Sequence, residues 1–163
     1  MEGNRSTKKD VSPASSLVSY LAATVRGRVH FPRARIGKAA RTKWGDPRVL
    51  KEIVVDRPGS GEPGAAFMVR FRVAGMSPRA NMAFLNLPIP FFAGLPGFRS
   101  KLWLYDPGTG YFEGLYEWDT VEDARAYAGS FAARFMKRRS VPGSAEYAIF
   151  DRARGEEVAH GAL

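Results

Sequence analysis

A turn motif between two strand-like segments is the feature that most constrains the fold of this chain. Residues 106–110 read Asp-Pro-Gly-Thr-Gly, and segments rich in aromatic and aliphatic residues lie on both sides. Proline fixes φ at about −65°, glycine tolerates positive φ, and an aspartate carboxylate can accept hydrogen bonds from its own turn. The pattern predicts a β-hairpin whose strands are residues 99–105 and 111–118.

A helix is predicted directly after the hairpin. Thr120 can cap its N-terminus, and Asp123 stands at the position that completes a capping box. Apolar residues then recur at helical spacing up to Lys137-Arg138-Arg139, whose cations suit the negative end of a helix dipole. We therefore expect one helix from residue 120 to residue 139, and we interpret the basic triplet as a helix end rather than an anion site.

Two more strands and a helix complete the predicted order. Residues 66–74 alternate between apolar and polar side chains, and residues 144–150 form a similar last segment, so both are expected to be strands. Ser77 and Pro78 are typical of a helix start, which predicts a helix over residues 78–86. The order β–α–β–β–α–β predicts a ferredoxin-like α+β sandwich: an antiparallel sheet with strand order 4-1-3-2 and both helices on one face.

The alternation also predicts which side chains face the helices. The apolar face is expected to hold Phe67, Val69, Phe71, Leu102, Leu104, Phe112, Tyr116, Trp118, Tyr147 and Ile149. The opposite face is expected to hold Arg70, Arg72, Lys101, Trp103, Tyr105, Tyr111, Glu113, Leu115, Glu117 and Glu146. Cross-strand ion pairs between the arginines and the glutamates are expected on this second face. Its mixture of aromatic and charged residues favours contact with a second copy of the chain, so we predict a homodimer.

The positive charge is concentrated in the first part of the chain. Residues 1–64 carry 13 Lys/Arg against 6 Asp/Glu, whereas the remaining residues carry 12 against 10. We therefore divide the chain into a basic N-terminal extension and linker (1–64), a ferredoxin-like domain (65–155) and a C-terminal tail (156–163) that is expected to fray. A short helix over residues 15–26 and a short strand or docking segment over residues 49–55 are expected within the extension.

A run of seven Lys/Arg without an acidic residue extends from Arg26 to Lys43. One interpretation is an arm that binds nucleic acid or an anionic membrane. The other is a basic extension that wraps its own domain. We favour the second interpretation because the sequence has no helix-turn-helix, zinc-finger or RNA-recognition pattern.

Composition excludes several kinds of site. The chain has no cysteine, which excludes disulfides and thiolate nucleophiles, and its two histidines, His30 and His160, lie outside the predicted sandwich. No phosphate-binding loop or Ser-His-Asp pattern is visible, so we expect neither a metal nor another cofactor. No apolar run is long enough for a membrane span and no signal peptide is evident, so a cytoplasmic protein is expected.

Two segments of the chain resemble a known family. They are GFRSKLWLYDPGTGYFEGLYEWDTVEDARAY (97–127) and VPGSAEYAIF (141–150). The family is the antibiotic-biosynthesis monooxygenase superfamily, and the likeness is strongest to its YdhR-like branch, over about residues 66–151. The resemblance implies a dimeric α+β barrel with a pocket between each sheet and its helices. Relatives of this kind include cofactor-independent oxygenases of electron-rich aromatic compounds, haem-binding proteins and isomerases.

The resemblance also implies a site in which Asn, Tyr and Trp side chains position a substrate in an apolar pocket. The matching residue types here suggest Asn86, Tyr116 and Trp118 as catalytic residues. Asn86 is favoured because an amide beside an apolar pocket must satisfy its hydrogen bonds and can orient a ligand. The expected substrate-binding residues are Asn81, Phe84, Phe112, Tyr127, Phe131 and Tyr147. Tyrosine and tryptophan are also common as plain core residues, so that alternative stays open.

Two functions remain open at this point. One is a small cofactor-independent monooxygenase-like or cyclase-like enzyme that acts on an aromatic or polyketide-like apolar molecule. The other is a non-catalytic dimeric module that binds an apolar ligand or a partner and uses the basic arm as a tether. We rank the enzyme first, on the resemblance alone.

Overall fold

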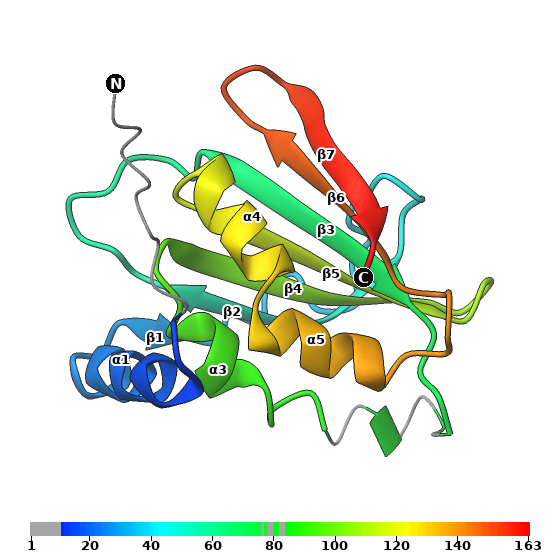
Figure 1. Ribbon diagram of the computed structural model, residues 1–163, viewed down its shortest axis with the longest axis horizontal. Coiled ribbons are helices and arrows are strands. Elements are labelled where there is room, and N and C mark those ends of the chain that lie inside the picture. Colours follow the sequence, from blue (N-terminus) through cyan, green and yellow to red (C-terminus); the bar gives the residue numbers. More distant parts are fainter. Residues whose placement is uncertain (1–10, 76, 78–79, 82–83) are drawn as a thin grey trace, which may run out of the picture.

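One antiparallel sheet with helices on one of its faces organises the molecule (Figure 1). The computed structural model describes residues 11–163 except 76, 78–79 and 82–83. The strands are β1 (Val29–His30), β2 (Arg48–Val55), β3 (Ala65–Phe71), β4 (Phe98–Asp106), β5 (Tyr111–Trp118), β6 (Glu146–Asp151) and β7 (Glu156–Ala162). The helices among the described residues are α1 (Pro13–Val25), α3 (Ile89–Ala93), α4 (Val121–Ala128) and α5 (Phe131–Arg138).

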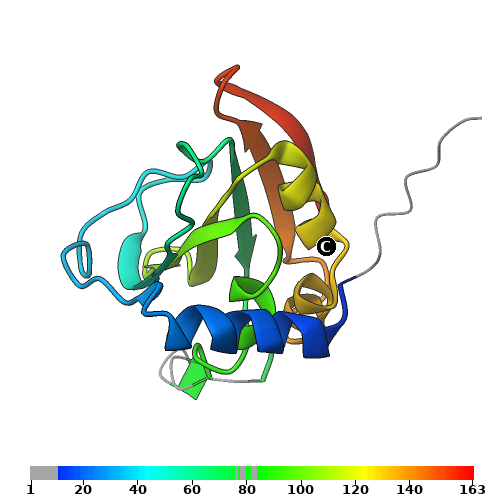
Figure 2. The ribbon, with the colours of Figure 1, turned by 90° about the vertical axis from the view of Figure 1, so that its left-hand side faces the viewer.

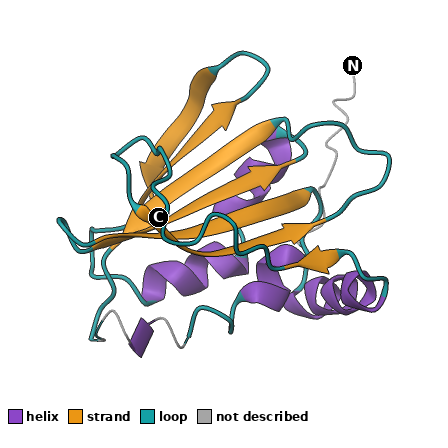
Figure 3. Ribbon diagram, turned by 180° about the vertical axis from the view of Figure 1, so that it is seen from behind, coloured by secondary structure: helices purple, strands orange, loops and turns teal. Residues whose placement is uncertain are grey.

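The centre of the sheet has the predicted ferredoxin-like arrangement. The strand order is β1-β2-β4-β5-β3-β6-β7, so the four central strands β4-β5-β3-β6 reproduce the expected order. In the turn between β4 and β5, the Asp106 carboxylate accepts bonds from the Gly108 amide at 2.9 Å and the Thr109 hydroxyl at 2.8 Å. The hairpin and the α+β fold class are therefore confirmed. Figure 3 shows the sheet from the other side, with the helices behind it.

The N-terminal third is built into the same sheet. β2 pairs with β4, and β1 pairs with β2. The short strand expected at residues 49–55 is therefore present as β2, which adds a strand to the β4 edge of the ferredoxin-like core. Helix α1 packs closely on the end of α3, because a Cβ added at Gly94 would lie 1.8 Å from the carbonyl oxygen of Ser16. Residues 11–64 therefore contribute strands and a helix that pack on the ferredoxin-like core.

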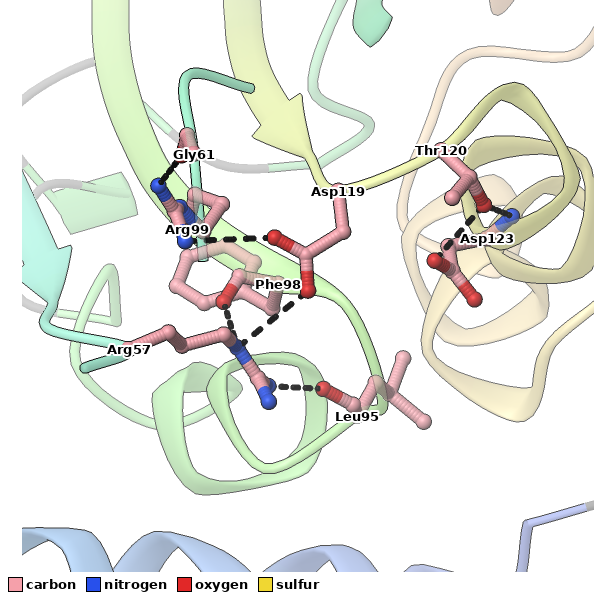
Figure 4. Close-up of polar contacts among 8 residues, drawn as sticks. All are labelled: Arg57, Gly61, Leu95, Phe98, Arg99, Asp119, Thr120 and Asp123. Carbon is pink, nitrogen blue, oxygen red and sulfur yellow. Dashed lines mark hydrogen bonds and ion pairs between the residues drawn. The ribbon is translucent and has the colours of Figure 1, made fainter. Parts of the chain in front are cut away.

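The Gly- and Pro-rich connection after β2 is held to the sheet by arginines (Figure 4). Arg57 donates to the carbonyl oxygens of Phe98 at 2.7 Å and Leu95 at 3.0 Å. Arg99 forms an ion pair with Asp119 at 3.2 Å and also donates to the carbonyl oxygen of Gly61. These bonds fasten the connection to the start of β4 and the end of β5.

The basic arm folds across the face of the sheet that the helices leave open, and Figure 2 shows residues 31–47 on that side. The arm turns back at residues 42–45, where the Thr42 amide donates to the Gly45 carbonyl at 2.8 Å. Its Trp44 ring lies 5.1 Å from the Arg70 guanidinium, and Lys43 forms an ion pair with Glu157 of β7 at 2.7 Å. These contacts place Lys43 and Trp44 of the arm on the sheet of the same chain. Binding to nucleic acid or a membrane stays a prediction.

The predicted faces are right for β3, β5 and β6 but wrong for β4. Observed cross-strand pairs are Lys101 with Tyr116, Trp103 with Gly114 and Tyr105 with Phe112. The length of the turn explains the error for β4. Because residues 107–110 form the loop, Asp106 pairs with Tyr111, and odd-numbered β4 residues lie beside even-numbered β5 residues. Lys101, Trp103 and Tyr105 therefore face the helices.

The opposite, arm-covered face takes the aliphatic residues of β4 instead. Leu102 and Leu104 are buried there with Ala40 and Val49. The predicted ion pair between Arg70 and Glu146 is present on this face. Because Trp103 and Tyr105 do not lie here, the argument for a homodimer through this face is weaker, and the dimer stays a prediction.

Three helix and tail predictions need correction. The helix expected over residues 120–139 is two helices, because Ser130 caps α5 by accepting a bond from the Ala133 amide at 3.2 Å. The tail expected to fray forms β7, which pairs with β6 along its length. The helix expected at 78–86 lies partly outside the described residues. Of the remainder, residues 80–81 are helical and residues 84–88 form turns.

Candidate active site

A cavity lies between the sheet and the helices, on the face that carries Lys101. It encloses about 60 Å³ of interior space, or about 680 Å³ when the open mouth is counted. It is lined by Phe71, Val73, Asn81, Phe84, Leu85, Pro88, Phe92, Lys101, Trp103, Phe112, Glu113, Gly114, Tyr116, Tyr127, Ala132, Phe135, Met136 and Arg139. Phe84 and Phe135 are 44% and 40% exposed, so they mark where the cavity meets the surface. Mostly apolar walls with a few polar groups are typical of small-molecule sites.

Gly114 keeps the sheet side of the cavity free of a side chain. Its cross-strand neighbour on β4 is Trp103. A Cβ at this position would lie 2.7 Å from the Tyr116 ring and 3.2 Å from a Val69 methyl group, which is closer than packed side chains allow. The glycine therefore lets the Tyr116 ring occupy its observed position beside the cavity.

A buried lysine, Lys101, lies in the cavity wall. The residue is only 6% exposed. Its ammonium nitrogen lies 4.5 Å from the ring centre of Phe92, 4.4 Å from that of Trp103 and 4.5 Å from that of Tyr116. Among the described residues, no carboxylate forms an ion pair with it. A buried lysine without an anionic partner is rare, because burying an unpaired charge is costly.

The surroundings of Lys101 favour its neutral form. Burial lowers the pKa of Lys101 well below its usual value, and the nearby charge of Lys51 lowers it further. The aromatic rings attract a cation and therefore oppose this effect in part. Of the two influences that lower the pKa, desolvation is larger than the charge of Lys51. The cavity therefore contains an amine that can accept a proton or attack an electrophile.

Two buried tyrosine hydroxyls form the second polar group of the site. Tyr127 of α4 donates a hydrogen bond to the Tyr116 hydroxyl of β5 over 2.8 Å. Burial raises the pKa of both side chains, that of Tyr116 well above its usual value. Both hydroxyls therefore stay protonated at neutral pH and act as hydrogen-bond donors. This bond uses one of the two hydroxyl protons, so the other remains for a ligand.

Asn81 and Arg139 supply the polar groups nearest the mouth. The Arg139 guanidinium donates to the Asn81 side-chain oxygen over 3.3 Å, and Asn81 is only 4% exposed. The same guanidinium lies 5.3 Å from the ring centre of Phe84 and 5.7 Å from that of Phe135. This arrangement holds the two mouth phenylalanines beside a cation.

The structure brings five of the predicted site residues to the cavity and places four elsewhere. The five are Asn81, Phe84, Phe112, Tyr116 and Tyr127. Trp118 is fully buried in the core against Phe98, with a ring-centre distance of 5.5 Å. Tyr147 stacks on Phe67 at 5.3 Å, and Phe131 packs on Phe91 at 5.7 Å.

Asn86 does not lie on the cavity. Its side chain is exposed and accepts a hydrogen bond from Lys51, in a separate surface hollow that Phe31 and Ile36 also line. The expectation that Asn86 sits beside the apolar pocket is therefore wrong in position. Its effect on activity is untested.

Lys101 is the residue that sequence reasoning missed. Strand alternation predicted that it lies on the face opposite the helices, together with Trp103 and Tyr105. The signal was present in the turn, because a four-residue loop between Asp106 and Tyr111 puts Lys101 on the same face as Tyr116. Combining loop length with alternation would have found it.

Within the described ranges, no group of three or more His, Asp or Glu side chains is placed so that it could hold a metal ion. No helix in the part of the chain that the structure describes is long and apolar enough to span a membrane.

Comparisons with known proteins add similar folds but no family. No protein-family model matches the sequence, and no curated protein matches it. One similar solved structure is an uncharacterized ferredoxin-fold protein related to antibiotic biosynthesis monooxygenases from Listeria monocytogenes 4b F2365. Its TM-score is 0.49 at 14% identity, over 69% of this chain and 68% of that chain. Another is an anthrone oxidase-like protein, with a TM-score of 0.46 at 18% identity, over 72% of this chain and 56% of that chain. At such scores the ferredoxin-like assignment rests on the strand order of this chain itself.

Proposed function

We propose that this protein is a monooxygenase-like enzyme without a resident cofactor, acting on an apolar aromatic molecule with an acidic hydroxyl or enolisable group. The observation that carries the proposal is the buried Lys101 amine in an aromatic-walled cavity, with no carboxylate partner among the described residues. The resemblance of residues 66–151 to the YdhR-like branch supports the same class of reaction.

The chemistry follows from the protonation states of the cavity groups. A neutral Lys101 accepts the proton of the bound phenol or enol, and the resulting ammonium holds the substrate anion. Tyr116 donates a hydrogen bond to the same oxygen. The aromatic anion is then electron-rich enough to reduce O2, so the substrate supplies the electrons. For a methylene between aromatic rings the balance is CH2 + O2 → C=O + H2O.

Oxygen uptake with anthrone, an enolisable aromatic ketone, tests the proposal. We expect uptake that depends on the protein, and we expect Lys101→Met to lower kcat/KM by about 100-fold or more, the usual effect of removing a general base. Lys137→Met, which removes an exposed lysine of α5 outside the cavity, should leave kcat/KM within about twofold. Equal loss in both variants, or no uptake despite binding, would exclude the proposed reaction.

A second candidate is non-catalytic binding of a small aromatic anion. It is favoured by the two buried hydroxyls of Tyr116 and Tyr127, which stay protonated at neutral pH and so can hold an anion without transferring a proton. Binding that depends on Lys101, with no oxygen uptake, would support this candidate over the enzyme.

A further inference from the structure

We infer that Lys101 is a site of covalent capture, whose side-chain amine forms a reversible imine with a small aromatic aldehyde or ketone that enters the cavity. This goes beyond the proposed oxygenation. Like that function, it requires an aromatic molecule that reaches the cavity and a neutral Lys101 amine.

The placement of the amine carries this inference. Lys101 lines the cavity, is 6% exposed, and has no ion-pair partner among the described residues, so no carboxylate holds it in the charged form. Phe92, Trp103 and Tyr116 surround the nitrogen within 4.5 Å of their ring centres. These rings can pack against an aryl group and exclude the water that would hydrolyse an imine.

A second lysine adds to the effect of burial. Lys51 pairs with Trp103 across β2 and β4, and its ammonium lies 5.4 Å from the centre of the same Trp103 ring that Lys101 contacts at 4.4 Å. Two cations at one ring repel each other, which disfavours a charge on the more buried one. Desolvation and a neighbouring cation are the two influences known to activate Schiff-base lysines.

The reaction needs no oxidant or reductant. The neutral amine adds to the carbonyl carbon, a C–N bond forms, and the carbonyl oxygen takes a proton to give a carbinolamine. The C–O bond then breaks, the oxygen leaves as water, and the nitrogen loses its remaining proton. One aldehyde and one lysine amine therefore give one imine and one water. Tyr116 stands opposite Lys101 on β5, where its hydroxyl can donate a hydrogen bond to the carbonyl oxygen.

Reductive trapping with benzaldehyde and cyanoborohydride at pH 7, followed by peptide mass mapping, tests the inference. The other lysines of the same molecule are internal controls, because Lys38, Lys43 and Lys137 are exposed. We expect the initial rate of benzylation at Lys101 to exceed that of each exposed lysine by about tenfold or more, since exposed amines are mostly protonated at this pH. Equal rates, or no modification of Lys101, would overturn the inference.

The pH dependence of trapping gives a second measurement on the folded protein. Lys51→Met keeps a long, unbranched side chain but removes the charge near Lys101, so the pH midpoint for Lys101 trapping should move upward. Lys38→Met removes an exposed charge and should leave the midpoint unchanged. An unchanged midpoint in Lys51→Met contradicts the electrostatic part of the inference. If that variant does not fold, the midpoint in the native protein decides, because a value like that of a free lysine overturns the inference.

The results also separate this inference from the proposed function. Trapping at Lys101 without oxygen uptake from anthrone would keep the inference and remove the oxygenase. Oxygen uptake that requires Lys101, without aldehyde trapping, would keep the oxygenase and remove the inference.

Discussion

The two faces of the sheet are both covered, but their charged residues are in opposite situations. On the face covered by the arm, Arg70 pairs with Glu146. Burial raises the pKa of Glu113 there, while a hydrogen bond from Thr42 and the charge of Arg70 lower it and so favour the carboxylate. On the face covered by the helices, Lys101 lies among three aromatic rings and near Lys51, and no carboxylate of the described residues pairs with it. A buried charge without partners lowers the stability of the fold, and such groups are common at functional sites. Glu113 and Lys101 are about equally buried, so the two faces differ in the partners of their charges and not in burial.

The largest effect on stability should come from the arm-covered face. Leu104 is fully buried against the arm, so Leu104→Ala should lower the free energy of unfolding by about 2–5 kcal/mol. Denaturant unfolding measures this loss. Binding in the cavity, measured on the folded variant at low temperature, should stay unchanged, because Leu104 points to the other face. A parallel loss of binding would show that the two faces are not independent.

Replacing Lys101 should stabilise the protein. Lys101→Met removes an amine that has no ion-pair partner in the described part of the chain, and we expect a gain of about 1–3 kcal/mol. Lys43 on the other face is the control: it pairs with Glu157, so Lys43→Met should lower stability by about 0–1 kcal/mol. A loss of stability in both variants would remove the proposed difference between the faces.

The same lysine predicts how stability varies with pH. The folded-state pKa of Lys101 lies below the usual 10.5, so between the two values the unfolded chain binds more protons than the folded one. Stability from this group should therefore rise as pH increases through that interval. The rise should be absent in Lys101→Met, and unfolding measured from about pH 7 to the usual lysine pKa in both proteins would detect it.

The tyrosine hydroxyls allow a finer comparison. Tyr116→Phe removes the acceptor for the Tyr127 hydroxyl, so it should cost about 1–2 kcal/mol and weaken binding of an aromatic ligand. Tyr111→Phe, on the opposite face, keeps the ring that contacts Arg70 and Arg72 and should change neither quantity measurably. Isothermal calorimetry and thermal unfolding of both variants measure the difference. Similar effects in the two variants would contradict a special role for the cavity hydroxyl.

The smallest effect is expected at Asn86. Because its side chain is exposed and lies outside the cavity, Asn86→Ala should change stability by less than about 0.5 kcal/mol and leave ligand binding intact. Asn81→Ala is the matched amide inside the cavity and should weaken binding several-fold. If Asn86→Ala abolishes turnover while Asn81→Ala does not, the site lies in the surface hollow beside Lys51 instead.

The parts of this fold that could be predicted are those specified by local signals. The turn at Asp106, the alternation of β3 and the cap at Thr120 each act over a few residues, and together they give the central strand order. The face of β4 depends on loop length as well as alternation, so alternation alone misplaced Lys101.

The remaining differences come from tertiary contacts that short segments do not reveal. The tail sequence Glu156–Ala162 is polar for a strand, and it becomes β7 because β6 offers it a free edge. The arm is ordered by the sheet face it covers, where Ala40 meets Leu102 and Leu104. Of the five predicted site residues that line the cavity, Phe112 and Tyr116 do so because the predicted face of β5 is right.

The position of β2 has a consequence for how the chain can be divided. A fragment that begins at residue 65 would keep the four central strands but would leave the whole length of β4 unpaired on one side. It would also expose Leu102 and Leu104, which the arm now buries. A long apolar edge strand of this kind recruits other chains, so such a fragment should aggregate. In the intact chain β2 covers β4. The outer side of β2 is in turn partly covered, by β1 at Val54 and Val55 and by the arm at Arg48 and Val49.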